Sequence, residues 1–187
     1  MSQLRIGMTR LGFAITPLVL TLACGTDTVP ASKVEVRINE LCSSNHDYQD
    51  ANGDTDDWIE LINLRSEPVD LAGYFIADTA NNRFKVELTA GVVVPGNDLF
   101  LLWADGEPNQ GPSHIAFQLG STGDGVCLSN PNGYVIDCVE FSAIPPNDAG
   151  TEDTSLARFP DGTGNFQWCS RSSPEERNGS RCSGFSL

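Results

Sequence analysis

The stretch Asp56-Asp57-Trp58-Ile59-Glu60-Leu61-Ile62-Asn63 is the clearest strand pattern in the chain, a short apolar run with two polar residues set into it. Its length and its β-branched and aromatic content predict a β-strand over residues 58–64, which we expect at the centre of a sheet. Glu60 and Asn63 interrupt the run. Because carboxylates are seldom buried without partners, we expect these two side chains to face solvent or to bond to a neighbouring turn.

Further strand patterns lie on both sides of this run. Residues 34–38 alternate between apolar and polar side chains, and 99–103 is the most apolar run, which we expect deep in the core. No window shows a sustained helical period with capping residues. Short strands separated by turn residues predict an all-β fold, an immunoglobulin-like β-sandwich. The other predicted strands are 69–71, 74–77, 84–88, 92–94, 115–119, 126–129 and 134–141, with 155–162 returning to the sheet edge.

A β-hairpin is predicted at Asn130-Pro131-Asn132-Gly133, because these turn residues separate two apolar runs. Cys127 and Cys138 are equidistant from the centre of this turn. A two-residue turn would place the two cysteines opposite each other, so that they could form a disulfide, whereas a bulged turn would shift the register by one residue.

The other cysteines point to a second crosslink. Cys169 and Cys182 flank a polar C-terminal tail, residues 169–187, and a disulfide between them would hold that tail in place. Cys42 is then left over, either buried or paired in a different connectivity.

The N-terminal segment has the layout of an export signal. Arg5 and Arg10 precede a mainly apolar run, 11–22, which is shorter than the roughly 20 residues that span a bilayer. We therefore expect residues 1–23 to be a signal peptide and an exported protein, in which disulfides are stable.

A lipid anchor is expected at Cys24. The segment Thr21-Leu22-Ala23-Cys24 resembles the lipobox of bacterial lipoproteins, although that motif prefers Leu where Thr21 stands. The resemblance implies a diacylated Cys24 as the new N-terminus, followed by a flexible tether, 24–33, and Gly25 is compatible with the outer membrane, facing the periplasm or the cell surface. The alternative is an ordinary cleaved signal peptide with an incidental cysteine.

The charge balance bears on the partners. The chain of 187 residues has 11 basic and 25 acidic residues and a formal net charge of -14. Such a surface repels phosphate backbones and favours cation binding, so we do not expect nucleic acid as a partner.

The acidic loop of residues 50–57, which precedes the predicted 58–64 strand, is a candidate calcium site. Carboxylate and amide oxygens on alternate residues suit a hard cation such as Ca²⁺. The loop begins like an EF-hand, but Thr55 replaces the glycine and Leu61 the closing glutamate. The alternative is a solvated turn whose side chains cap backbone N–H groups. The expected ligands are Asp50, Asn52, Asp54, Asp56 and Asp57.

No catalytic motif accompanies these features. The two histidines, His46 and His114, stand in no nucleophile-elbow or zinc-protease motif. The cysteine spacings do not suit a zinc site either. We therefore expect a protein that is not an enzyme. Calcium is its one candidate cofactor.

The order of motifs resembles the lamin tail domain, an immunoglobulin-like module of nuclear lamins that also occurs in bacterial exported proteins. The resemblance implies such a domain over 34–168, with a binding or structural role, and His114 as a structural residue. No heptad run like the lamin rod occurs in these 187 residues. The matching pieces are 38–40, 57–63, 69–74, 94–96, 101–106, His114 with Phe117 and Leu119, and 155–162.

Together these features predict a lipid-anchored binding or structural module of the cell envelope, whose partner is an envelope protein or a glycan. One alternative is a calcium-dependent adhesion or scaffold module. Another, which the resemblance implies, is an accessory module for an extracellular hydrolase or nuclease.

Overall fold

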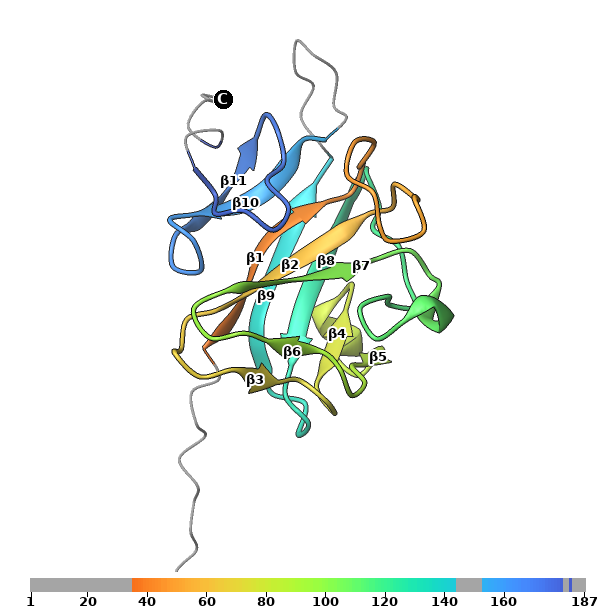
Figure 1. Cartoon of the computed structure of the whole chain (residues 1–187), viewed down its shortest axis with the longest axis vertical. Coiled ribbons are helices and arrows are strands. Elements are labelled where there is room, and N and C mark those ends of the chain that lie inside the picture. Colours follow the sequence, from red (N-terminus) through yellow and green to blue (C-terminus); the bar gives the residue numbers. More distant parts are fainter. Residues whose placement is uncertain (1–34, 144–152, 180–181, 183–187) are drawn as a thin grey trace, which may run out of the picture. The chain divides into compact units, whose positions relative to one another are not determined.

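The computed structural model describes residues 35–143, 153–179 and 182. The predicted signal peptide, Cys24 and the tether lie outside these residues. The described part is all-β, with eleven strands and two short 3-10 turns, and Figure 1 shows the strands. The fold is a sandwich of two main sheets, as the strand pattern predicted.

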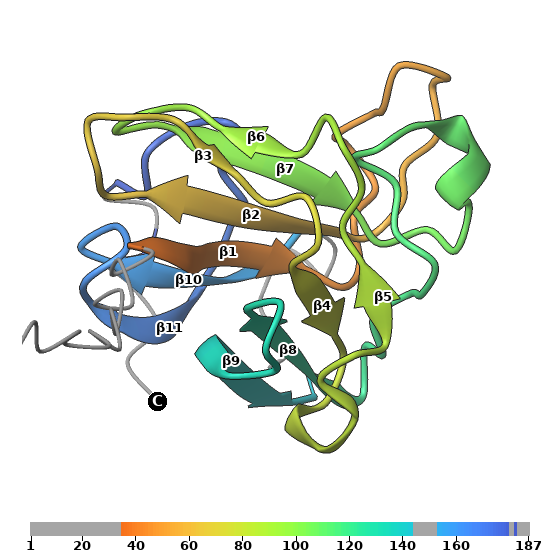
Figure 2. The same cartoon turned by 90° about the horizontal axis from the view of Figure 1, so that it is seen from below.

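One sheet has five strands in the order β11-β10-β1-β2-β7, and the other has four in the order β5-β4-β8-β9. The two sheets face each other in Figure 2. A small pair, β3 with β6, accompanies them. The strand bounds are β1 Val36–Cys42, β2 Trp58–Asn63, β3 Val69–Asp70, β4 Phe75–Ala77, β5 Val86–Glu87, β6 Val93–Val94, β7 Leu99–Trp103, β8 Gly123–Ser129, β9 Val135–Ser142, β10 Ser155–Phe159 and β11 Asn165–Cys169.

Strand β2 lies between β1 and β7, antiparallel to both, and all six of its residues are buried. The face of the five-stranded sheet that meets the four-stranded sheet is apolar, and we call it the inner face. Its side chains pack with those of β4 and β8 into one core, which drives folding by removing apolar area from water. Core members include Val36, Ile38, Ile59, Leu61, Ile76, Leu102, Val126 and Leu128.

The hairpin of β8 and β9 has the predicted turn. The side-chain oxygen of Asn130 accepts hydrogen bonds from the backbone N–H groups of Asn132 and Tyr134. Gly133 has a φ of 76°, which glycine adopts without strain. Cys127 and Cys138 stand opposite each other at disulfide distance, 4.1 Å between Cα atoms, because the register shift falls on the turn side of them.

Two predicted strands are wrong or shortened. Of the 84–88 run only β5 is a strand, because residues 83–85 form part of a turn. Residues 115–119 form no strand, although His114 and Gln118 make isolated bridges to Trp103 and Asp105. This segment closes over the end of β7 as a loop, so its apolar side chains reach the core without ladder pairing.

The C-terminal part differs from the expected sheet edge. Strand β10 falls within the predicted 155–162 run, but it lies inside the sheet, between β1 and β11. The sequence pattern did not predict β11, whose pairing with β10 makes it the edge strand. Cys169, the last residue of β11, lies at disulfide distance from Cys182, with 4.1 Å between the Cα atoms.

Candidate functional site

The candidate site lies on the face of the five-stranded sheet that points away from the inner core, which we call the outer face. Side chains alternate between faces along a strand, so Trp58 and Glu60 lie opposite to Ile59 and Leu61. Trp58, Cys42, Leu101 and Trp103 form a second apolar cluster there, against which Tyr48 packs. The outer face is thus as fully buried along β2 as the inner face.

Two carboxylates are buried side by side in this face. Glu40 of β1 stands opposite Glu60 of β2 in the ladder, and both are 0% exposed. Burial raises the pKa of Glu60 to about 8, because a charged carboxylate is costly to remove from water. Burial likewise raises the pKa of Glu40.

Residues 171–178, which we call the strap, cover these carboxylates. The backbone N–H and the Oγ of Ser173 donate to Glu40, at 3.0 and 2.8 Å. The backbone N–H of Glu175 donates to Glu60 at 2.8 Å. Asn178 donates to the carbonyl of Arg158 in β10 at 3.0 Å. The strap is therefore fixed by directed hydrogen bonds, and the described part of the polar tail is packed on the sheet.

Tyr48 divides the surface above the outer face. Its ring stacks on Trp103, with 5.7 Å between centroids and 13° between planes. Its hydroxyl donates to the carboxylate of Glu175 at 2.6 Å, and burial together with this contact raises the pKa of Tyr48. Tyr48 thereby connects the 43–57 loop to the strap, and a hollow lies on each side of it.

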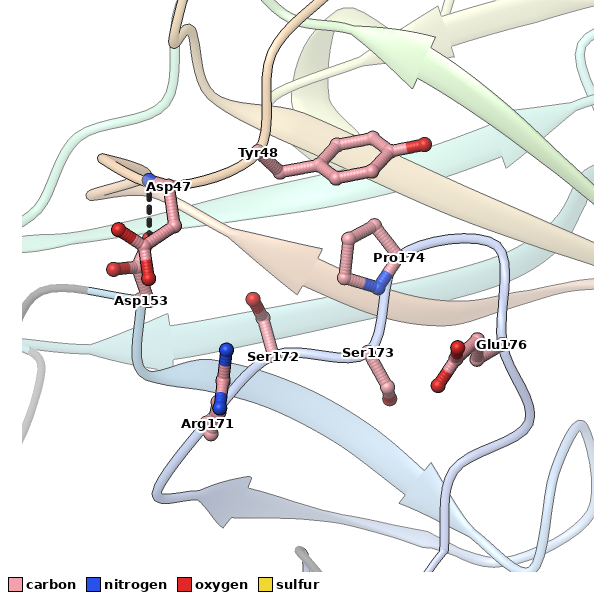
Figure 3. Close-up of a pocket in the computed structure, with 8 residues that line it drawn as sticks. All are labelled: Asp47, Tyr48, Asp153, Arg171, Ser172, Ser173, Pro174 and Glu176. Carbon is pink, nitrogen blue, oxygen red and sulfur yellow. Dashed lines mark hydrogen bonds between the residues drawn. The ribbon is translucent and has the colours of Figure 1, made fainter.

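The first hollow has a volume of about 330 Å³, and most of the residues that line it carry polar side chains. Figure 3 shows Tyr48 on one side and, on the other, the strap residues Arg171 to Pro174 and Glu176. The carboxylate of Asp153 accepts hydrogen bonds from the backbone N–H groups of His46 and Asp47. The hollow is lined by Asp47, Tyr48, Asp153, Arg171, Ser172, Ser173, Pro174 and Glu176.

The second hollow has a volume of about 340 Å³ and lies along β7. Its walls are the 48–51 loop and Glu175, and β7 supplies an apolar floor. It is lined by Tyr48, Gln49, Asp50, Ala51, Leu99, Phe100, Leu101, Trp103, Ser113 and Glu175.

The acidic loop is shaped by Asp50. Its Oδ1 accepts hydrogen bonds from the backbone N–H groups of Asn52 and Asp54, both at 2.8 Å. Desolvation raises the pKa of Asp50, but these hydrogen bonds outweigh it, so the pKa is lowered. This is the capping arrangement that the solvated-turn alternative predicts.

The last two expected calcium ligands differ in their surroundings. Asp57 is bound to the backbone N–H of Leu119, and burial raises its pKa to about 6. The pKa of Asp56 is raised by burial and by neighbouring carboxylates, Asp105 first among them. Within 35–143, 153–179 and 182, no three His, Cys, Asp or Glu side chains are placed to hold one metal ion. Calcium binding stays a prediction.

His114, His46 and Cys42 have structural surroundings. The ring of His114 stacks on Trp103 and bonds to the carboxylate of Asp105. His46 contacts the carbonyl of Ser44 at the surface. The free thiol of Cys42 is buried beside the carbonyl of Thr154, and burial raises its pKa to about 12, which disfavours the reactive thiolate.

The sequence reasoning missed the strap, Glu40 and Tyr48. The sequence held part of the signal for a covering segment. Glu40 and Glu60 both interrupt apolar runs, and each requires a hydrogen-bond donor if it is buried. Nothing in the local pattern indicates that Ser173 and Glu175 provide those donors, since they lie more than a hundred residues away.

Comparison with known proteins agrees with this architecture. The family model described as Lamin Tail Domain matches residues 30–143, which is more than half of the chain. A search of curated proteins finds no match. The matched region includes β1 to β9 and stops before β10, β11 and the strap. The chain therefore belongs to the lamin tail domain family, whose module is an immunoglobulin-like sandwich.

Proposed function

We propose that this protein is a non-enzymatic binding or structural module of the bacterial cell envelope, held at the membrane by a lipid on Cys24. The observation that carries the binding role is the pair of hollows on either side of Tyr48. Both are formed by segments distant in sequence, and the second also has strand β7 as its floor. Loops that a β-scaffold brings together commonly form binding sites.

The buried acids favour a structural role over catalysis. Paired carboxylates with raised pKa values are also found in active sites. Here, however, Glu40 and Glu60 are fully buried and their oxygens accept hydrogen bonds from Ser173, Asn39 and Glu175. A reacting group would have to displace the strap to reach them.

The anchor is supported by the Thr21–Cys24 sequence. Export is supported by the two cysteine pairs at disulfide distance, which suit an oxidising compartment. No helix of the described residues is long and apolar enough to span a membrane. Detergent-phase partitioning of the full chain, compared with Cys24→Ser, tests the anchor. We expect the wild type in the detergent phase and the variant in the aqueous phase. Equal partitioning would exclude lipidation.

A pull-down from envelope extract tests the binding role. We expect one stoichiometric protein or one polysaccharide to be recovered, and to be lost with Tyr48→Ala, which removes the wall shared by both hollows. A hydrolase or nuclease among the recovered proteins would favour the accessory alternative. Recovery only in the presence of Ca²⁺ would favour the calcium-dependent adhesion alternative. Recovery that Tyr48→Ala leaves unchanged would exclude the hollows as the site.

A further inference from the structure

Strand β7 is an edge strand with one side of its backbone turned away from β2. Two backbone hydrogen bonds flank the ladder between β2 and β7. Ala104 N–H donates to the carbonyl of Asp57 at one end, and Asn63 N–H donates to the carbonyl of Asp98 at the other. They identify Trp58–Trp103 and Ile62–Leu99 as pairs of the non-hydrogen-bonded kind. The backbone groups of Leu99, Leu101 and Trp103 therefore point away from β2.

These outward groups are only partly used. Trp103 accepts from Ile115 N–H and donates to the carbonyl of Ser113, at 2.8 and 2.7 Å. The N–H of Leu99 donates to the side chain of Asp98. Among the described residues, no partner is found for the N–H or the carbonyl of Leu101, or for the carbonyl of Leu99. An edge with such groups is a template for another strand.

The second hollow lies beside these groups. Leu99, Leu101 and Trp103 share the outer face, because they alternate with Phe100 and Leu102 of the inner core, and all three line the hollow. A strand added next to β7 would place every second side chain beside this apolar floor. The charged residues that line the hollow are Asp50 and Glu175, both acidic, and no described Lys or Arg lines it.

We propose that the β7 edge binds an extended, Lys- or Arg-bearing segment of a partner protein by strand addition. Leu101 donates to and accepts from the peptide backbone, apolar side chains of the peptide lie on Leu99 and Leu101, and its cationic side chain faces Asp50 and Glu175. Backbone bonds supply affinity in this recognition mode, and the side chains supply specificity. This inference rests on the proposed binding function and names its partner class.

The test is selection of a phage-displayed random dodecapeptide library on the full chain, followed by fluorescence anisotropy with the enriched peptides. We expect enriched sequences in which Lys or Arg stands among alternating apolar residues. Methylating the backbone nitrogens of such a peptide on alternate residues removes its strand-forming donors. The methyl groups can stand on either of two sets of alternate residues. We expect the set whose N–H groups face β7 to weaken binding at least tenfold.

The protein variant for this test is Asp50→Asn with Glu175→Gln. It removes both charges but keeps the oxygens that accept from Asn52, Asp54 and Tyr48. We expect about tenfold weaker peptide binding, since two partly exposed ion pairs are lost. The matched control, Glu87→Gln with Glu140→Gln, removes two exposed charges from the other sheet and should bind as the wild type.

Each of the following results would overturn the inference: no enriched peptide, anionic enriched peptides, insensitivity to methylation on both sets of residues, or equal losses in variant and control. Dimerisation of the chain that the variant abolishes would overturn it in favour of a second copy as the occupant. If the envelope pull-down succeeds and depends on Tyr48 while no peptide is enriched, the proposed function stands and only the strand-addition inference fails.

Discussion

The two faces of β2 are buried by different means. On the inner face, Ile59 and Leu61 belong to an apolar core that is closed by a whole second sheet. On the outer face, Trp58 lies under Tyr48 of the 43–57 loop, and Glu60 lies under the strap. Both faces exclude water, yet one is covered by a sheet and the other by two irregular segments.

The two faces show that the amount of surface buried and the precision with which a covering segment is positioned depend on different interactions. Apolar contacts stabilise in proportion to area and tolerate many shapes. Hydrogen bonds to a buried carboxylate require donors in fixed places, and a missing donor leaves a costly unsatisfied group. Glu40 and Glu60 therefore hold the strap by directed hydrogen bonds, and we expect the inner core to supply most of the stability.

The largest expected effect is on the inner face. Leu61→Ala should lower the free energy of unfolding by about 2–5 kcal/mol, because it leaves a cavity in a close-packed core. Urea denaturation measures this loss. Val135→Ala, at a residue that is 42% exposed, is the control and should change stability by less than about 0.5 kcal/mol. Similar losses at the two positions would contradict the dominance of the inner core.

A smaller effect with a different signature is expected on the outer face. Glu40→Ala leaves the backbone N–H of Ser173 without its acceptor and leaves its Oγ with Asn178 as the remaining one, which should cost about 1–3 kcal/mol. Hydrogen exchange should show the amides of Ser173 and Glu175 opening well before those of β2. Glu40→Gln keeps an acceptor oxygen and should protect these amides better than Ala does. If strap and β2 amides open together in Glu40→Ala, the strap is not a separately held element.

The pH dependence of stability sharpens the same comparison. The pKa of Glu60 is raised from 4.5 to about 8 on folding, so the folded state binds the proton more tightly. This contribution is complete below pH 4.5 and is lost as the pH rises to about 8, so stability should fall over that window. Urea denaturation at intervals across it should show a shallower fall in Glu60→Gln. Some fall should persist, because burial also raises the pKa of Asp57, to about 6. An unchanged slope in Glu60→Gln would mean that Glu60 is ionised in the folded protein.

The smallest effect is expected from calcium. A site in the 50–57 loop would raise the Tm by mass action in millimolar Ca²⁺. Because Asp50 already caps its own loop, we expect at most a small rise. A thermal scan with Ca²⁺, with Mg²⁺ and with a chelator measures it. A large rise specific to Ca²⁺ and absent in Asp54→Ala would contradict the capping interpretation and establish the predicted site.

The sequence predicted the elements whose signal is local. Short apolar runs placed β2 and β7 within one residue of their observed bounds, and the Asn130 turn predicted the hairpin that carries Cys127 and Cys138, whose opposite positions were one of two predicted registers. The expectation for Glu60 was half right: it bonds to a turn, but it is buried. The pairing of β10 with β1 and the contact of Ser173 with Glu40 depend on tertiary packing across more than a hundred residues, and no local periodicity encodes it.

The position of β10 and β11 has a practical consequence for anyone who trims the chain to its family match. A fragment ending at residue 143 would lose the partner of Glu40 and Leu41 in β1, which would turn an interior strand into a bare edge. It would also leave two acids open to water on one side of the sheet. We expect such a fragment to aggregate during expression, whereas one that extends through Cys182 should stay soluble. The described β-sandwich thus extends beyond the region by which the family is recognised, and we expect it to fold only with β10, β11 and the strap present.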